Sequence, residues 1–145
     1  MYKTILVPLD GSIRAEAILP HVKSLAQCTD AKLVLLTIVD PPVAFISPYD
    51  VMPSFSTDEV QEQRKDAESY LTRLQQKVQA EGIMVTTVVE YGAIVATIIE
   101  VAEREKADLV AMASHGRTGL SRVFYGSVAA GVLQRIDRPL LLVRS

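Results

Sequence analysis

The sequence predicts an α/β fold in which helices cover both faces of an open, mostly parallel five-stranded sheet. Five short apolar runs alternate along the chain with longer segments of helical periodicity. Most of the runs are continuously apolar and rich in β-branched residues, which is typical of strands buried on both faces. The resulting order, βαβαβαβαβ, requires right-handed crossovers between parallel strands.

The five expected strands are short and are separated by segments long enough to hold a helix. We place them at Thr4–Leu9, Lys32–Val39, Met84–Val89, Leu109–Ala113 and Leu140–Val143. A chain of 145 residues fits one domain, 1–145, whose core needs no disulfide or metal.

The segments between the strands have their own start and stop signals. Within 14–27, Pro20 should kink a helix, because proline lacks an N–H donor. The second helix opens with Ser56 and Glu59 as a capping box and stops near Gly82. The third and fourth helices each place apolar residues on one face, namely Val95, Ile98, Ile99 and Ala102, then Val128, Val132, Leu133 and Ile136.

One segment breaks this rhythm. Residues 40–55, DPPVAFISPYDVMPSF, contain four prolines and no clean period. The segment is too long for a simple turn between a strand and a helix, so we interpret it as a functional or mobile loop.

Charge and composition exclude several classes of protein. The formal net charge of −2 gives no electrostatic attraction to nucleic acid or to an anionic membrane. No run approaches the ~18 apolar residues of a membrane span, and the apolar N-terminal run is too short for a secretory signal. Cys28, the only cysteine, indicates a reducing compartment and is expected to be at least half-buried. We therefore expect a soluble, cytoplasmic protein.

Two polar clusters follow the first and fourth strands, at the edge where parallel sheets bind ligands. The first is Pro8-Leu9-Asp10-Gly11-Ser12, and the second begins Ala113-Ser114-His115-Gly116-Arg117. Carboxylate oxygens such as those of Asp10 suit ribose hydroxyls or a divalent ion. Each cluster could also be only a turn and a helix cap.

Gly126 and Ser127 open the fourth helix. A helix start has unsatisfied N–H groups and the positive end of the helix dipole, so it is suited to an anion such as phosphate. Arg117 and Arg122 add positive charge nearby. The two histidines and one cysteine are too far apart in sequence to indicate a zinc site, and no Walker-type Gly-Lys-Ser/Thr is present.

Three stretches of this sequence resemble the universal stress protein family. They are ILVPLDGS near the start, ASHGRTGLSRVFYGSVA late in the chain and RPLLLVRS at the end. The family's nucleotide-binding branch carries Gly-x2-Gly-x9-Gly-Ser/Thr. The matching positions are Ala113, Gly116, Gly126 and Ser127, so alanine stands where the motif has its first glycine.

The resemblance implies an adenine nucleotide site and assigns residues to each part of the ligand. ATP is the leading ligand, with ADP and AMP as alternatives and Mg²⁺ as an accompanying ion. Asp10, with Ser12 beside it, would bind ribose, and Pro8 would pack near the base. Backbone at Ile38 and Val39 would bracket the adenine. The phosphates would be held by Ser114, His115, Gly116 and Arg117 from one side and by Gly126, Ser127 and Val128 from the other, and the Cβ of Ala113 would narrow the approach to the ligand.

The resemblance also implies strand order 3-2-1-4-5 and a homodimer joined through Leu140–Val143, an apolar edge strand. We expect a stress-response or regulatory protein that binds ATP and hydrolyses it at most slowly, because no catalytic base can be assigned. One alternative is a dimeric interaction module of the family's non-binding branch, which Ala113 would favour. Another is an α/β enzyme that takes a different phosphorylated substrate in the same crevice.

Overall fold

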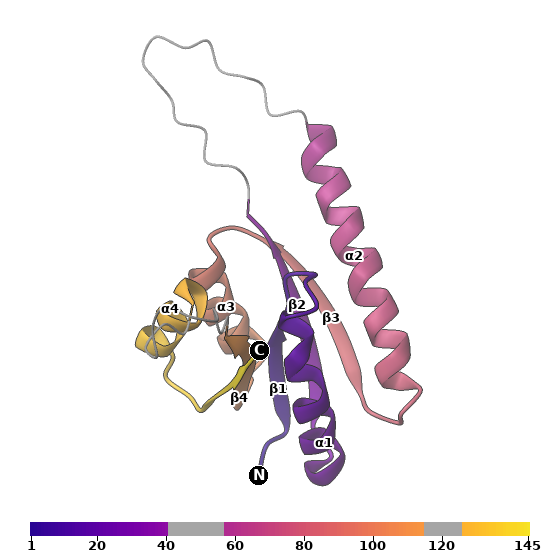
Figure 1. The fold of residues 1–145 in the computed structure, drawn as a ribbon, viewed down its shortest axis with the longest axis vertical. Helices are drawn as coiled ribbons and strands as arrows, with labels where there is room; N and C mark the ends of the chain where they lie inside the picture. The colour runs from indigo at the N-terminus through magenta and orange to yellow at the C-terminus, as the bar shows by residue number, and fades with distance from the viewer. Residues whose placement is uncertain (41–56, 115–125) are drawn as a thin grey trace.

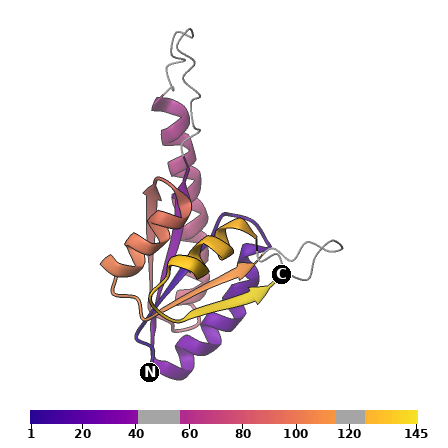
Figure 2. The same cartoon turned by 90° about the vertical axis from the view of Figure 1, so that its left-hand side faces the viewer.

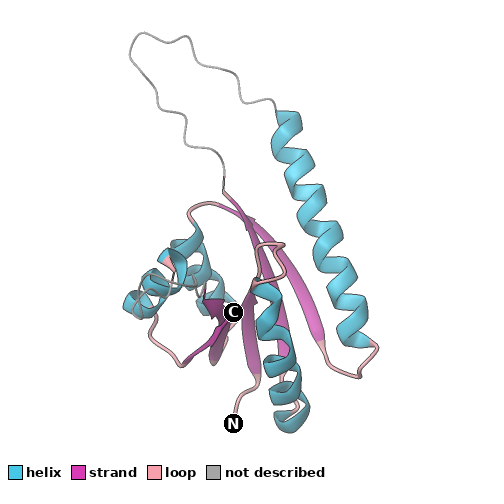
Figure 3. Ribbon diagram, viewed as in Figure 1, coloured by secondary structure: helices cyan, strands magenta, loops and turns pink. Residues whose placement is uncertain are grey.

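The computed structural model describes residues 1–40, 57–114 and 126–145, which form a parallel sheet covered by helices on both faces (Figures 1 and 3). The five strands are β1 (Thr4–Pro8), β2 (Lys32–Val39), β3 (Val85–Tyr91), β4 (Leu109–Ser114) and β5 (Leu140–Arg144). Their order is β3-β2-β1-β4-β5, and every pair is parallel. The predicted fold class and strand order are thus confirmed.

The helices divide between the two faces of the sheet. They are α1 (Leu19–Thr29), α2 (Thr57–Gln79), α3 (Ile94–Arg104) and α4 (Ser127–Arg135), with a short 3₁₀ helix, η1 (Ala15–Ile18), before α1. The core under α1 and α2 contains Ile5, Val7 and Leu35, and the core under α3 and α4 contains Leu6, Val34 and Leu36. Adjacent strand residues therefore point to opposite faces, and both faces are apolar, which explains the continuous apolar runs.

Three sequence expectations need correction. Pro20 does not kink a helix; it occupies the first turn of α1, where a missing N–H costs nothing, and the residues before it form the 3₁₀ helix. Leu133 is 51% exposed, because the buried face of α4 is formed by Ala129 and Val132. Cys28 is exposed, since α1 buries Val22 and Ala26 instead. Ser56 and the predicted loop beyond Asp40 lie outside the described residues.

The strands β1 and β4 pair at the centre of the sheet but separate towards their carboxyl ends. At the opposite edge, the Asp108 carboxylate accepts the N–H groups of Lys3 and Thr4 at 2.8 and 3.1 Å. The β1–β4 ladder then runs only through the pairs Ile5–Leu109 and Leu6–Val110, although β1 continues to Pro8 and β4 to Ser114. The separation opens a crevice between them, at the point where strand order reverses.

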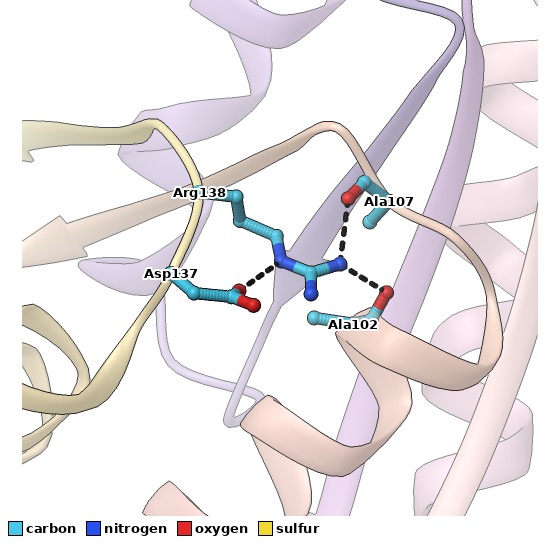
Figure 4. Close-up of polar contacts among 4 residues, drawn as sticks. All are labelled: Ala102, Ala107, Asp137 and Arg138. Carbon is cyan, nitrogen blue, oxygen red and sulfur yellow. Dashed lines mark hydrogen bonds and ion pairs between the residues drawn. The ribbon is translucent and has the colours of Figure 1, made fainter.

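Arg138 connects the start of β5 to the end of α3 (Figure 4). Its Nη1 donates to the carbonyl oxygens of Ala102 and Ala107, both at 2.9 Å, and its Nε donates to Asp137 Oδ1 at 2.8 Å. The Ala102 carbonyl also accepts the Ala107 N–H at 2.9 Å, so the guanidinium adds a second donor at the end of α3 and ties β5 to the turn that follows this helix. The hydrogen bond from Arg138 also lowers the pKa of the Asp137 carboxyl. These contacts lie at the end of α3 away from the crevice.

Candidate functional site

The crevice between β1 and β4 holds a cavity of about 170 Å³. It brings together seven residues that the sequence places at a ligand site: Pro8, Asp10, Ile38, Ala113, Gly126, Ser127 and Val128. They come from the ends of β1, β2 and β4 and from the start of α4. Segments far apart in the sequence therefore meet at one edge of the sheet, as parallel topology requires.

The rest of the cavity wall is apolar, and sequence reasoning missed it. Ile94 and Ile98 come from the first turns of α3, and Leu36 and Met112 come from β2 and β4. Ile98 is fully buried and Met112 is 6% exposed. A signal was present, because Ile94 and Ile98 are spaced one helical turn apart at the start of a helix that also begins at this edge. The wall suits a flat apolar group such as a purine base.

Asp10 lies at the mouth of the cavity in a turn held by its own side chain. Asp10 Oδ1 accepts the Ser12 N–H at 2.9 Å and the Ser12 hydroxyl at 2.6 Å, and Ser12 Oγ in turn accepts the Ala15 N–H at 3.1 Å. Ser12 therefore supports the turn and does not line the cavity. Within the described part of the chain, these bonds leave Oδ2 of the exposed Asp10 available to accept from a ligand hydroxyl.

The preceding residues fix this turn against the neighbouring strand. The Leu9 N–H donates to the Leu36 carbonyl at 2.7 Å, and the Thr37 hydroxyl donates to the Leu9 carbonyl at 3.0 Å. Thr37 and Leu9 are both buried, so these bonds form in a protected environment. Asp10 is consequently held at a defined place relative to β2.

Gly126 supplies the helix terminus at the cavity. Its backbone has φ 70° and ψ 151°, a combination that is essentially restricted to glycine. This conformation turns the chain directly into α4, and no side chain of the N-cap residue hydrogen-bonds to that helix end. Ser127, Val128 and Ala129 in the first turn of α4 line the cavity, and a helix start of this kind, with its free N–H groups and the positive end of the helix dipole, favours an anion.

Ser114 and Val39 do not line this cavity. Ser114 is 2% exposed, and its carbonyl accepts the N–H and hydroxyl of Ser145 at 3.2 and 3.0 Å, so it anchors the C-terminal end of the chain. Val39 lines a second cavity on the other face of the sheet. His115, Gly116, Arg117 and Arg122 lie outside the described residues.

The second cavity, of about 460 Å³, lies between the end of β2 and the side of α2. Asp10 and Ile38 border both cavities, whereas Asp66, Tyr70 and Arg73 of α2 border only the second. The Tyr70 hydroxyl is buried and has no hydrogen-bond partner within the described structure. Burial raises the pKa of Tyr70 to about 12, and the carboxylates of Glu16 and Asp10 add to the rise.

The described residues at this edge of the sheet are recognition groups for a ligand. Among residues 1–40, 57–114 and 126–145, no group of three or more His, Cys, Asp or Glu side chains is placed to hold a metal ion. Of the helices in these ranges, none is both long and apolar enough to cross a membrane. The crevice can present an apolar wall, one carboxylate and a helix N-terminus to a ligand.

Comparisons with known proteins agree with this architecture. The model of the universal stress protein family matches residues 1–144. Universal stress protein MJ0531 of Methanocaldococcus jannaschii is 30% identical over 99% of this chain and 83% of its own length. The solved structure of MJ0577, from the same organism, has a TM-score of 0.83 and 28% identity and covers 100% of this chain and 97% of its own.

A further solved structure, a universal stress protein in complex with cAMP, has a TM-score of 0.73 and covers 99% of this chain and 97% of its own. Its identity of 23% shows a shared fold alone. The family match and the full-length relative together establish that this chain belongs to the universal stress protein family.

Proposed function

We propose that this chain is a cytosolic regulatory protein of the stress response that binds ATP, or ADP or AMP, in the cavity between β1 and β4. The observation that carries the proposal is the meeting of Gly126 at the start of α4 with Asp10 at the end of β1, across an apolar wall. The cAMP complex of a protein with this fold supports the same class of ligand.

Each part of an adenine nucleotide has a counterpart in the cavity. The base would pack between Pro8 and Ile38 and against the isoleucines of α3, because Pro8, Ile38 and Ile94 are apolar and half-buried and Ile98 is fully buried. Asp10 Oδ2 would accept hydrogen bonds from ribose hydroxyls. The amides of the first turn of α4 would bind the phosphates, where the glycine at 126 allows close approach.

A magnesium ion would arrive with the nucleotide. The cavity wall contributes a single carboxylate, that of Asp10, among the described residues. Mg²⁺ is commonly held by one or two carboxylates together with substrate phosphates, so this donor set fits an ion carried by ATP better than a resident metal. Hydrolysis would be slow at most, because the one carboxylate of the described wall, that of Asp10, is bonded to Ser12 and would be occupied by the ribose.

The identity of a co-purified ligand tests the proposal. The protein is purified without added nucleotide, denatured, and its small-molecule content analysed by mass spectrometry, with calorimetry of the emptied protein against ATP and GTP. We expect an adenine nucleotide and preferential binding of ATP. A different phosphorylated metabolite would favour the α/β enzyme alternative, and no ligand together with no ATP binding would favour the interaction module.

We also propose a homodimer joined through β5. This strand is at the edge of the sheet, and its residues Leu140–Val143 are apolar and only partly buried. An uncovered apolar edge is suited to pairing with a second chain, and a two-fold axis would place each β5 beside its copy. This role and the nucleotide site are compatible, since they use different strands.

Hydrogen bonds at the ends of β5 identify a residue for testing the dimer. The Pro139 carbonyl accepts the Val110 N–H at 3.0 Å, and the Ser145 N–H donates to the Ser114 carbonyl at 3.2 Å. Backbone groups of alternate residues in a strand bond to the same neighbouring strand, so the N–H and C=O groups of the odd-numbered residues of β5 point towards β4. Leu142 therefore presents its N–H to the open edge.

Leu142→Pro should remove a donor from the dimer interface and leave the bonds to β4 in place. We expect sedimentation of the wild type as a dimer at micromolar concentration and a shift of the variant towards monomer. Leu141→Pro, which removes an N–H facing β4, is the matched control and should reduce the free energy of unfolding instead. A wild-type monomer, or a dimer unaffected in folded Leu142→Pro, would contradict the proposed interface.

A further inference from the structure

The helices α3 and α4 lie side by side on one face of the sheet (Figures 1 and 2). They approach each other at Gly131. Gly131 is the fifth residue of the nine in α4. Apart from proline, glycine is the least favourable residue in a helix interior, and α4 is too short to be stable without its packing. Another requirement must therefore account for a glycine at this position.

That requirement is the space taken by Val95 of α3. A Cβ atom added to Gly131 would lie 2.8 Å from Val95 Cγ2, 3.4 Å from Cγ1 and 3.6 Å from Cβ. Carbon atoms in contact are normally about 3.5–4.0 Å apart. A helical valine has one strongly preferred χ1 rotamer, so Val95 has little freedom to turn away. Any larger residue at 131 would push the two helices apart by about 1 Å.

The same two helices border the candidate nucleotide cavity with their first turns. Ile94 and Ile98 of α3 line it on one side, and 126–129 of α4 line it on the other. Gly131 and Val95 themselves do not line it. A displacement of α4 away from α3 would therefore move the amides at the start of α4 relative to the apolar wall, without placing a new atom in the cavity.

We propose that the contact between Gly131 and Val95 sets the position of the N-terminus of α4, which makes Gly131 a positioning residue for the phosphate groups of the ligand. The inference rests on the proposed nucleotide site. Gly131 does not line the cavity, but it would influence the affinity for the phosphates because it sets the distance between α3 and α4. The base and ribose depend on β1, β2 and α3, so they are less affected by the placement of α4.

Calorimetry with ATP and with adenosine separates these contributions. We compare the wild type, Gly131→Ala, Val95→Ala, the double variant Val95→Ala/Gly131→Ala, and Gln134→Ala as a control on the exposed side of α4. We expect Gly131→Ala to weaken ATP binding about five- to tenfold and adenosine binding less than twofold. The double variant should recover ATP affinity to within twofold of Val95→Ala, because the smaller side chain at 95 leaves room for the added methyl. Gln134→Ala should bind both ligands as the wild type does.

Three results would overturn the inference. They are unchanged ATP affinity in folded Gly131→Ala, an equal loss for ATP and adenosine, and failure of the double variant to recover. A wild type that binds neither ligand would instead refute the proposed function. The positioning role then has its own readout in the amide chemical shifts of Ser127 and Val128, which should change in Gly131→Ala and return in the double variant. Shifts that stay at wild-type values would overturn it independently of any ligand.

Discussion

The helices α2 and α4 both begin at the carboxyl edge of the sheet, on opposite faces, yet they present different chemistry there. The 23-residue α2 begins beyond the ends of the strands (Figure 1), and the first buried residue in its described part, 58–79, is Ala67. The nine-residue α4 starts at the edge itself, and its third residue, Ala129, is already buried. Helix length relative to the strands therefore decides which part of a helix reaches a ligand.

The two cavities differ in the corresponding way. At the first, α4 offers backbone N–H groups beside an apolar wall. At the second, the side of α2 offers the side chains of Asp66, Tyr70 and Arg73. Asp10 and Ile38 line both cavities, so the turn after β1 borders the candidate nucleotide cavity on one face and a cavity with charges of both signs on the other. Variants on each face can test whether nucleotide binding belongs to the first cavity alone.

The largest effect is expected from Gly126→Val on the α4 face. A branched side chain would obstruct the phosphate position, and the backbone at φ 70° and ψ 151° is strained for any residue other than glycine. We expect ATP affinity to fall more than tenfold, or by at least about 1.4 kcal/mol, measured by calorimetry. Gly82→Val is the control, because Gly82 also has a positive φ of 80° but lies in the turn before β3. Equal binding by wild type and Gly126→Val would refute the site.

Arg138→Met tests the far end of the α3–α4 face. Loss of the guanidinium removes hydrogen bonds to the Ala102 and Ala107 carbonyls, so chemical denaturation should show a free energy of unfolding lower by about 1–3 kcal/mol. ATP affinity should be unchanged, because Arg138 lies away from the cavity. If the variant loses ATP affinity while still folded, the two ends of the α3–α4 face are coupled. Arg138 would then affect ligand binding as well as the free energy of unfolding.

Tyr70→Phe tests the α2 face through pH. The folded-state pKa of Tyr70 is raised to about 12 from 10.0, so folding favours the protonated hydroxyl. Stability is therefore independent of this ionisation below about pH 10 and falls as pH rises from about 10 to about 12, because the unfolded chain loses the Tyr70 proton first. Denaturation curves of the wild type should show a steeper loss of stability over this range than those of Tyr70→Phe. Identical profiles would contradict the raised pKa.

At neutral pH, Tyr70→Phe should leave stability unchanged or increase it by up to about 1 kcal/mol, because it removes a buried hydroxyl that has no hydrogen-bond partner among the described residues. Its ATP affinity should equal that of the wild type. Weaker ATP binding would show that the second cavity belongs to the nucleotide site.

Ala113→Gly should have the smallest effect. Ala113 lines the first cavity at the position where the family motif has glycine. Removing its Cβ should tighten ATP binding by a few-fold at most, with a loss of about 0.4–1 kcal/mol in folding free energy from the added chain entropy. Calorimetry and denaturation measure the two separately. Weaker ATP binding would show that alanine fits this site better than glycine.

Strand placement could be predicted from the sequence because both faces of the sheet are buried, and continuous apolar runs such as that of β2 follow directly. The structure of the segment before Pro20 could not be predicted in this way, because the packing of η1 decides whether the proline kinks a helix or begins one. Val39 shows a second limit. Adjacent strand residues point to opposite faces, so Ile38 and Val39 border different sets of cavities although they are neighbours in sequence.

The candidate site was predictable where it follows strand ends and unpredictable where it depends on helix placement. Asp10 and Gly126 could be paired because parallel topology brings the ends of β1 and β4 to one edge. The spacing of Ile94 and Ile98 indicated a shared face at the start of α3, but only the packing of α3 against α4 assigns that face to the same cavity. That packing in turn depends on the fit of Gly131 against Val95, which is a feature of three-dimensional shape and not of residue type.

The early end of the β1–β4 ladder also affects how the molecule resists deformation. Two residue pairs join β3-β2-β1 to β4-β5 at the middle of the sheet. A ligand held by Asp10 on one side and by the start of α4 on the other would connect β3-β2-β1 to β4-β5 where β1 and β4 are no longer paired. Ligand binding should therefore slow hydrogen–deuterium exchange in β1 and β4 as well as at the residues that contact the ligand, because the added connection suppresses local opening between these two strands.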